Sequence, residues 1–240
     1  MKHMSDRRYL IVNADDFGQS VGINRGIIKS FEKGIVTSAS LMVRWPAAHA
    51  ACRYAREHND LSVGLHVDLG EWTYRGGNWI PIYEVVQLED SAKVNAEVFR
   101  QLETFRTLTG KDPSHLDSHQ HVHRSEPIRS ILAETANQLG IPLRSNSDVH
   151  YCGAFYGQTE DGEPLLDNIS KNALARMISD LPYGVTELGC HPAEEVDFET
   201  MYRGERVHEL ETLCDREIRE LIAKMKVELC SFHRVSEIWR

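Results

Sequence analysis

The sequence predicts an α/β fold, a distorted (β/α) TIM-like barrel of about seven or eight strand-helix units in a single domain. Two observations indicate this. Short apolar runs typical of buried parallel strands alternate with amphipathic stretches along most of the 240 residues. Hydrophobic residues make up 41% of the chain, enough for a substantial core, and no linker-like stretch divides it. We therefore expect an N-terminal tail at residues 1–8 and one barrel domain at residues 9–240.

Local signals place the elements of the first part of the chain. Residues 9–12 are all apolar and predict a buried strand, and polar residues begin where it stops. Ser20 is expected to cap a helix over residues 21–33, which Gly34 ends. The next predicted elements are a strand at 35–43, a helix from Pro46 to about residue 58 and a strand at 61–65.

Two aromatic, glycine-bearing regions interrupt this pattern. Residues 71–83 and 150–163 show no period, and we interpret the first as a loop over the site. Helices at residues 91–109 and 125–139 flank a histidine-rich segment. The remaining predicted elements are a helix at 169–181, a strand at 185–190, one charged helix at 205–226 and a final strand at 227–232.

The histidine-rich segment places a metal-binding or ionisable side chain at every second position. In an extended backbone these side chains share a face, so the segment would present one polar row suited to the mouth of a metal site. Only one or two could bind one ion, because alternate residues are roughly 6 to 7 Å apart and Zn–N bonds are about 2 Å. A solvated edge strand is the alternative. The row consists of His115, Asp117, His119, His121 and His123.

Polar side chains also follow the predicted strands at their carboxyl ends, which meet at one rim in a βα barrel. One carboxylate and two imidazoles suit a divalent ion with open coordination positions, and Asp16, His66 and His119 can supply them. An unligated neighbouring carboxylate could act as a general base, and a histidine from another strand could protonate a leaving group. The rim residues are Asp15, Asp16, His66, His119, Arg144 and His191.

Each of these features also has an ordinary structural explanation. Paired aspartates often cap helices, and a histidine such as His66 is often a hydrogen-bonded structural residue. His191 precedes a proline and could mark a turn, while Arg144 could pair with a surface carboxylate. Trp72 and Trp79 could pack within their loop or contact a sugar. The joint position of the polar residues at strand ends favours a catalytic site.

Charge and cysteine content narrow the partners and the compartment. Lys and Arg number 27 against 36 Asp and Glu, a net charge of −9, which disfavours nucleic acid and anionic lipid and favours a neutral substrate. Five cysteines without a Cys-x-x-Cys pair indicate reduced thiols. No apolar stretch approaches the roughly 18 residues of a membrane span, and the polar N-terminus differs from a signal peptide, so we expect a cytoplasmic protein.

Four motifs occur in an order and spacing that define a family resemblance: NADDFG at residues 13–18, GLH at 64–66, HLDSHQHVH at 115–123 and ELGCHP at 187–192. Together they closely resemble the YdjC-like carbohydrate deacetylases. The resemblance implies a distorted βα barrel and metal-dependent hydrolysis of the N-acetyl group of an acetylated amino sugar, such as a chito-oligosaccharide, with release of acetate. It also implies a homodimer.

The resemblance extends to site residues. Gln120 stands where some family members have histidine, and we expect it to point away from residues 119 and 121. The regions at residues 71–83 and 150–163 contain no motif that the resemblance covers, and substrate contacts at Trp72, His121 and Phe155 are our own prediction. The roles that the family pattern implies are metal ligation by Asp16, His66 and His119, base catalysis by Asp15, acid catalysis by His191 and orientation of the base by Arg144.

The identity of the ion and two other functions stay open at this point. Two histidines and a carboxylate suit zinc, while magnesium, manganese or cobalt are alternatives. A metal-independent glycoside hydrolase on the same barrel would use two carboxylates and be indifferent to a chelator. A non-catalytic sugar- or metal-binding module would be stabilised by its ligand without releasing acetate.

Overall fold

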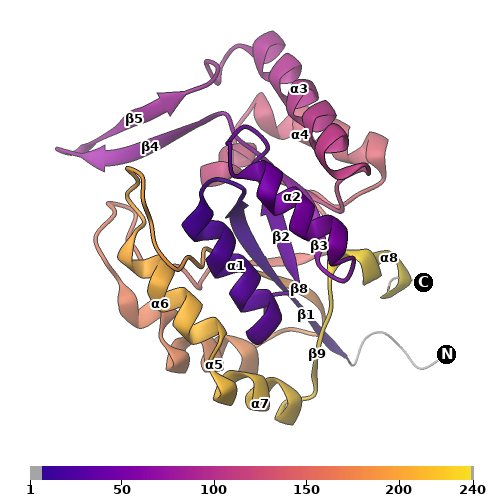
Figure 1. Cartoon of the computed structure of the whole chain (residues 1–240), viewed down its shortest axis with the longest axis vertical. Coiled ribbons are helices and arrows are strands. Elements are labelled where there is room, and N and C mark those ends of the chain that lie inside the picture. Colours follow the sequence, from indigo (N-terminus) through magenta and orange to yellow (C-terminus); the bar gives the residue numbers. More distant parts are fainter. Residues whose placement is uncertain (1–6, 239–240) are drawn as a thin grey trace.

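A curled parallel β-sheet forms the centre of the protein, in a computed structural model that describes residues 7–238 (Figure 1). Among these residues the sheet has seven strands in the order β6, β3, β2, β1, β8 and β7, with β9 beside β1. Its ladders are parallel, so the strands end at the same edge. The strands are β1 (Arg8–Phe17), β2 (Ser38–Leu41), β3 (Ser62–Val67), β6 (Leu116–Ser118), β7 (His150–Cys152), β8 (Gly184–Cys190) and β9 (Val227–Leu229).

The central strand β1 lies between two groups of packed side chains, one on each face of the sheet. It pairs with β8 on one edge and with β9 and then β2 on the other. Successive side chains of a strand face opposite sides of the sheet. Leu10 therefore packs in the main core, whereas Ile11 packs in a smaller cluster with Val185 and Phe232 on the other face. Asp15 lies four residues beyond Ile11 and so continues that second face towards the carboxyl end of the sheet.

Helices surround the sheet, with α1 crossing in front of it and α5, α6 and α7 gathered below in Figure 1. Helix α1 begins where predicted, because the Ser20 hydroxyl accepts the backbone N–H of Ile23 at 3.2 Å. The α-helices are α1 (Val21–Lys33), α2 (Ala48–Glu57), α3 (Ser91–Thr109), α4 (Ile128–Leu139), α5 (Lys171–Ser179), α6 (Gly204–Leu213), α7 (Arg216–Lys224) and α8 (Val235–Ile238), and the 3₁₀ helices are η2 (His119–Arg124), η3 (Leu166–Ile169) and η4 (Phe232–Arg234).

The predicted fold class, a distorted α/β barrel, is confirmed. Within residues 7–238 no ladder joins the edge strands β6 and β7, and the sheet extends past β6 only through an isolated bridge between Leu116 and Leu143. The barrel is therefore incomplete on this side. Residues 1–6 of the predicted tail lie outside the described residues, and β1 already begins at Arg8.

The prediction of an irregular loop at residues 71–83 was wrong. This region is an antiparallel hairpin of β4 (Gly70–Arg75) and β5 (Asn78–Glu84), which projects from the upper left of the body in Figure 1. Gly76 and Gly77 connect the strands with φ angles of 59° and 83°. A two-residue turn with both φ angles positive matches the twist of a hairpin and favours glycine. The Gly-Gly pair was the signal that indicated this turn.

Three other element predictions need correction. The single helix expected at residues 205–226 is two helices, because Asp215 interrupts it and caps α7 by accepting the backbone N–H of Glu217 at 2.7 Å. Helix α4 begins at Ile128, after Pro127, rather than at residue 125. The irregular region at 150–163 contains the short strand β7. None of the described helices has the length and apolar character needed to cross a bilayer.

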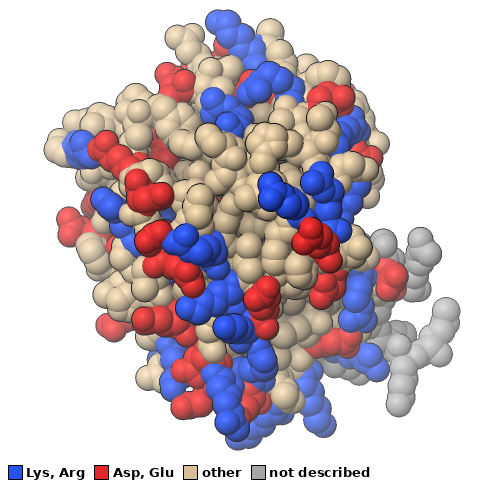
Figure 2. Space-filling view, viewed as in Figure 1, with Lys and Arg blue, Asp and Glu red and all other residues tan. Residues whose placement is uncertain are grey.

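Charges of both signs share the surface. On the face shown in Figure 2, blue Lys and Arg side chains alternate with red Asp and Glu side chains, most densely over the lower part where α1, α6 and α7 lie. Several form ion pairs, such as Arg25 with Glu194 at 3.0 Å. This face of the described residues therefore presents no continuous basic field of the kind that attracts nucleic acid.

Candidate metal and catalytic site

A cavity of about 780 Å³ lies at the carboxyl ends of the strands. Most of the predicted rim residues line it, and Arg144 lies behind them, fully buried. Aromatic side chains form much of the remaining wall, which suits a ligand with apolar faces. The rim residues that line the cavity are Asp15, Asp16, His66, His119 and His191, and the aromatic residues are Trp72, Trp79, Tyr151, Phe155, Tyr156 and Tyr202.

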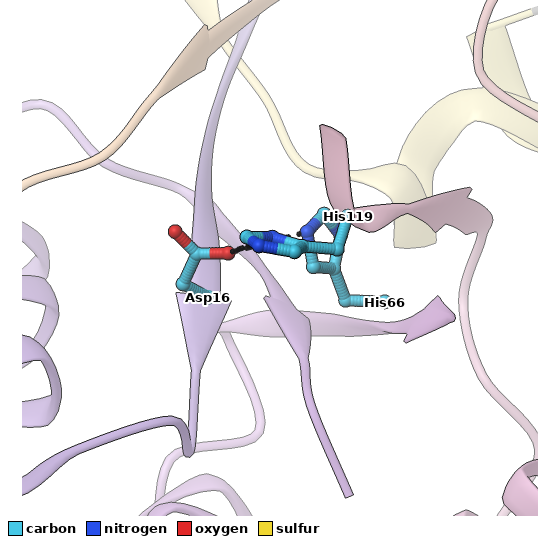
Figure 3. A group of neighbouring side chains, drawn as sticks. All are labelled: Asp16, His66 and His119. Carbon is cyan, nitrogen blue, oxygen red and sulfur yellow. Dashed lines mark hydrogen bonds and ion pairs between the residues drawn. The ribbon is translucent and has the colours of Figure 1, made fainter. Parts of the chain in front are cut away.

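Asp16, His66 and His119 converge on one point, as Figure 3 shows. Asp16 comes from the end of β1, His66 from β3 and His119 from the residue after β6. Asp16 Oδ1 lies 3.3 Å from His66 Nε2 and 3.0 Å from His119 Nδ1. The three side chains offer ligand atoms within 4.8 Å of one another, and all three are buried. The predicted ligand set is therefore brought together.

This donor set fits a divalent ion. In a tetrahedral site with bonds of about 2.0 Å, neighbouring ligand atoms lie about 3.3 Å apart. The distances from Asp16 Oδ1 to the two imidazole nitrogens, 3.3 and 3.0 Å, are in this range. A carboxylate and two imidazoles are also donors that zinc and related ions accept. The residues could thus hold one ion and leave further coordination positions to water and substrate.

The ring orientation of His66 is set by a carboxylate on its far side. His66 Nδ1 lies 2.7 Å from Asp117 Oδ1, which leaves Nε2 to face Asp16. Burial alone would lower the pKa of His66, but Asp117 and Asp15 outweigh it and raise the pKa to about 9. A carboxylate that accepts the outer N–H of a ligating histidine is the usual support of a metal site.

Asp16 is held in an unusual backbone conformation and by an arginine from a distant helix. Its φ angle is +68°, a left-handed value that Asp and Asn adopt more readily than most residues. Its second oxygen, Oδ2, accepts from Arg206 Nη2 at 2.7 Å. Burial would raise the pKa of Asp16, but Arg206 and His119 outweigh it and hold the pKa well below its usual range. Asp16 is therefore an anion with one oxygen turned towards the two histidines.

Asp15 lies beside the ligand set and is bound by Arg144 instead. Arg144 donates to both Asp15 oxygens at 2.7 Å, and its guanidinium also lies 2.7 Å from Asp117 and 2.6 Å from Glu187. Burial would raise the pKa of Asp15, but Arg144 outweighs it, and the pKa is lowered. Glu187 shows the opposite result, since burial raises its pKa to about 7 despite Arg144.

A second acidic group offers less for a metal. Asp15, His66 and Asp117 also have ligand atoms within 4.8 Å of one another. However, Arg144 already lies 2.7 Å from an oxygen of each aspartate, so a guanidinium cation occupies the space between their charges. The group around Asp16 is therefore the better candidate.

His191 follows β8 and faces Asp15 across the cavity wall. Its Nε2 lies 3.7 Å from Asp15 Oδ2. On its other side, Glu209 accepts the backbone N–H of His191, and a Glu209 oxygen lies 3.8 Å from His191 Nδ1. Tyr202 donates its hydroxyl to the same carboxylate. His191 thus has one ring nitrogen towards the cavity and one towards a buried carboxylate.

The prediction of one extended histidine row was wrong beyond Ser118. There β6 ends, and Gln120 and His121 have φ angles of 48° and 54°, which turn the chain into η2. His115 serves packing, because its ring stacks on Phe232 with centroids 3.8 Å apart, and burial lowers its pKa to about 3. The alternation of the sequence therefore does not persist as a structural period.

The outer histidines of the row have separate surroundings. His123 Nδ1 lies 2.8 Å from the Ser118 hydroxyl, which also accepts the backbone N–H of His123. His121 reaches the cavity wall, where its Nε2 lies 3.3 Å from the Tyr151 hydroxyl. Burial lowers the pKa of His121 to about 2 and that of His123 to about 4. Both are neutral imidazoles that could not act as acids near neutral pH.

The predicted substrate contacts differ in exposure. Trp72 and His121 are half-buried and line the cavity, as a contact residue should. Phe155 also borders the cavity but is only 1% exposed and belongs to the main core, so most of its surface is taken by packing. Gln120 is exposed and borders the cavity, and its amide binds the backbone N–H and carbonyl of Trp72 at 2.9 and 2.8 Å.

Sequence reasoning missed three buried polar residues of the site: Arg206, Glu209 and Glu71. Arg206 and Glu209 lie on α6, where the sequence shows only another charged helix. Their spacing of three residues places both on one helix face, and this was the only local signal. Glu71 lies at the start of β4, next to the predicted Trp72. No feature of the local sequence distinguishes it from a surface residue.

Comparison with known proteins identifies the family. The profile of the YdjC-like protein family matches residues 9–224, and the chain belongs to this family. A carbohydrate deacetylase of Geobacillus stearothermophilus is 32% identical and aligns with 94% of this chain and 97% of its own. A chitooligosaccharide deacetylase of Klebsiella pneumoniae strain 342 is also 32% identical, with 95% and 99% covered.

Solved structures share the fold. A protein of Enterococcus faecalis V583, provisionally described as a cellobiose-phosphate cleavage protein, superposes with a TM-score of 0.76 at 23% identity and covers 96% of this chain and 99% of its own. A family 4 carbohydrate esterase of Streptomyces lividans, solved with acetate, gives a TM-score of 0.57 at 14% identity, with 93% and 91% covered. At these identities the likeness concerns the fold.

Proposed function

We propose that this protein is a metal-dependent carbohydrate deacetylase, which hydrolyses the N-acetyl group of an acetylated amino sugar such as a chito-oligosaccharide and releases acetate. The observation that carries the proposal is the convergence of Asp16, His66 and His119 beside an unligated carboxylate, Asp15, and an opposing histidine, His191. The names of the relatives from Geobacillus and Klebsiella support the same reaction class.

The ion would supply electrophilic chemistry to this site. Held by Asp16, His66 and His119, a divalent ion would polarise the acetamide carbonyl and make an attacking water more acidic. Zinc suits two imidazoles and one carboxylate, while magnesium, manganese and cobalt are alternatives that the donor set also accepts.

Asp15 is proposed as the general base. It would accept a proton from the water that attacks the acetamide carbon, which requires a carboxylate that is ionised and held in place. Arg144 supplies both conditions. It binds both Asp15 oxygens at 2.7 Å, and its charge outweighs the effect of burial, so that the pKa of Asp15 is lowered. Because both oxygens are bound, the carboxylate cannot turn away from the cavity without losing a hydrogen bond.

His191 is proposed as the general acid. As the C–N bond breaks, its Nε2 would donate a proton to the sugar amine, so that the products are acetate and a free amino sugar. The two proposed proton carriers face each other, with His191 Nε2 3.7 Å from Asp15 Oδ2. On the opposite side of the ring, a Glu209 oxygen lies 3.8 Å from His191 Nδ1.

Substrate binding is proposed at the aromatic wall of the cavity. Trp72 and His121 would contact the sugar, since the apolar face of a pyranose packs well on aromatic rings, and Phe155, which is 1% exposed, would form the floor behind them. The exposed rim and the hairpin would determine which sugars fit. We further propose a cytoplasmic protein, supported by five cysteines that are all free. A homodimer remains a prediction from the family.

The test is a screen for acetate release from N-acetylated mono- and oligosaccharides, with untreated enzyme, chelator-treated enzyme and chelator-treated enzyme given back zinc, magnesium, manganese or cobalt. We expect acetate release that a chelator abolishes and one of the ions restores. Cleavage of glycosidic bonds that is indifferent to the chelator would instead identify a glycoside hydrolase. Ligand binding without any product would identify a binding module.

A further inference from the structure

Glu71 is a buried carboxylate to which no role has been given. It is the second residue of β4, at the root of the hairpin and away from its turn, and is 3% exposed. Within residues 7–238 its only oppositely charged neighbour within 4.0 Å is His119, whose Nε2 lies 3.7 Å from Glu71 Oε2. The amide of Gln19 lies 3.5 Å from the same oxygen. A carboxylate buried at such cost requires a cationic or strongly donating partner.

His119 has a ring nitrogen that lacks a hydrogen-bond acceptor in the part of the chain that the structure describes. Its Nδ1 faces Asp16 Oδ1 at 3.0 Å, on the side where the ligand atoms converge. Its Nε2 is buried and has no hydrogen-bond partner among the described residues. If Nδ1 provides the lone pair to an ion, the proton must be on Nε2, which then points at Glu71. Within residues 7–238, the Nε2 nitrogen of His119, which has no hydrogen-bond partner, therefore points towards a carboxylate whose single side-chain hydrogen bond is a long one of 3.5 Å from Gln19.

The other ligand histidine has the same arrangement in completed form. His66 turns Nε2 to Asp16 and places Nδ1 2.7 Å from Asp117. Each histidine therefore has one nitrogen directed to Asp16 and the other directed to a carboxylate, Asp117 for His66 and Glu71 for His119. The two rings use opposite nitrogens, since His66 turns Nε2 and His119 turns Nδ1 towards Asp16.

Neighbouring contacts fix the distance between the two partners. Gln120, the residue after His119, binds both backbone groups of Trp72, the residue after Glu71, at 2.9 and 2.8 Å. These paired hydrogen bonds hold the root of the hairpin against the segment that follows β6. His119 needs such support, because the backbone beside it has left the sheet and turns through the left-handed residues Gln120 and His121.

We infer that Glu71 is a positioning residue of the metal site, whose carboxylate accepts the Nε2 proton of His119 and so fixes the tautomer and the ring plane that present Nδ1 to the ion. The inference rests on the proposed function, because it assigns a role within the same ion site. In this arrangement Glu71, at the root of the β4–β5 hairpin, supports the ion. Trp72 and Trp79 of the same hairpin line the cavity.

Ion affinity, measured apart from activity, tests this inference. Metal-free protein is titrated with Zn²⁺ or Co²⁺ by calorimetry for wild type, Glu71→Gln and Glu71→Asp, with Glu84→Gln as the matched control. Glu84 is an exposed carboxylate of β5 on the same hairpin. We expect about a 10- to 100-fold loss of affinity for Glu71→Gln, the range typical of carboxylates that support a ligating histidine. Glu84→Gln should bind as wild type does.

The outcomes separate the inference from the proposed function. Failure of the wild type to bind an ion, or an ion-loaded wild type that releases no acetate, would overturn the proposed function. Wild-type binding with unchanged affinity in Glu71→Gln would overturn only the role of Glu71. Thermal unfolding of the metal-free variants checks their folding, and if Glu71→Gln does not fold, Glu71→Asp decides. This variant keeps the charge but withdraws it from His119, so unchanged affinity would again refute the role.

Discussion

Arg144 donates two parallel hydrogen bonds to Asp15, from Nη1 to Oδ2 and from Nη2 to Oδ1, both 2.7 Å long. The arginine follows the bridge at Leu143 and the aspartate lies on β1, so the pair links positions 129 residues apart in the sequence. Such a bidentate pair fixes both the charge and the plane of a carboxylate. It also engages both oxygens of Asp15, so that Asp16 rather than its neighbour is available as the ion ligand.

Substituting Asp15→Asn should separate base catalysis from ion binding. The amide keeps the shape but cannot accept the proton of water, so acetate release should fall by about 10²- to 10⁴-fold. Ion content, measured by elemental analysis, should stay near that of wild type, because Asp16, His66 and His119 are unchanged. Activity close to wild type would remove Asp15 from the base role.

Substituting Arg144→Met should destabilise the protein strongly. Asp15 and Asp117 would be left as buried anions, and Glu187 as a buried carboxyl group, without the cation that contacts all three. Removing one partner of a buried pair costs about 3–5 kcal/mol, measured here as a lowered midpoint of urea unfolding. Arg129→Met, which breaks an exposed pair with Glu126, should cost less than about 1 kcal/mol. Equal effects of the two substitutions would contradict this account.

Each ligand substitution should remove the ion. Asp16→Asn is preferable to alanine, because asparagine tolerates the φ angle of +68° at this position. With His66→Gln and His119→Gln, it should lower ion affinity by more than the roughly 100-fold loss expected for an outer partner. His208, an exposed histidine on α6, provides the control, and His208→Gln should retain the ion. Full ion content in any of the three variants would exclude that residue from the ligand set.

The metal-free protein should be most stable near neutral pH. The pKa of His66 is about 9 in the fold, above the ordinary value of about 6.5, so its stabilisation is present below pH 6.5 and is lost as the pH rises through 9. The pKa values of His115, His121 and His123 are lowered to about 3, 2 and 4 by burial, so they favour unfolding as the pH falls below about 6.5.

Thermal unfolding of chelator-treated protein between pH 4 and pH 10 measures this profile, in which both limbs should slope downward from the maximum. The variant His66→Gln should have a shallower alkaline limb than the wild type, because it lacks the group that loses its proton there. A wild-type melting temperature that is constant between pH 7 and pH 9 would be inconsistent with the raised pKa of His66.

Trp72 and Phe155 should respond differently to truncation. Trp72 is half-buried on the cavity wall, so Trp72→Ala should mainly raise KM for the sugar, by roughly 2- to 13-fold for a lost aromatic contact of about 0.5–1.5 kcal/mol. Phe155 is 1% exposed, so Phe155→Ala should cost about 3–5 kcal/mol of stability through the cavity it leaves. Urea unfolding and steady-state kinetics on both variants distinguish contact from packing.

Elements with local signals at both ends could be predicted from the sequence. Helix α1 has the bounds that Ser20 and Gly34 indicate, and α3 runs to Gly110, whose φ angle of +77° closes it in the left-handed conformation. The rim was predictable for a related reason. Asp16 and His66 each follow an apolar run, and parallel strands deliver the residues at their ends to one edge.

Features that depend on tertiary contacts could not be predicted. The histidine row reads as a strand, but the chain turns at Gln120 because the amide of this residue binds the hairpin backbone, a contact between segments 48 residues apart. Arg206 reaches Asp16 across 190 residues, and its neighbours on α6 are equally charged. Nothing local in the sequence marks which arginine of that region points inward.

The hairpin pairs only with itself within the described residues, since β4 and β5 form a separate two-stranded sheet. Its outer portion can therefore be lengthened, shortened or replaced without shifting the register of any barrel strand. Natural variation or laboratory evolution could replace that portion of the hairpin and so change which sugars fit the cavity. The positions of Asp16, His66 and His119 would stay the same.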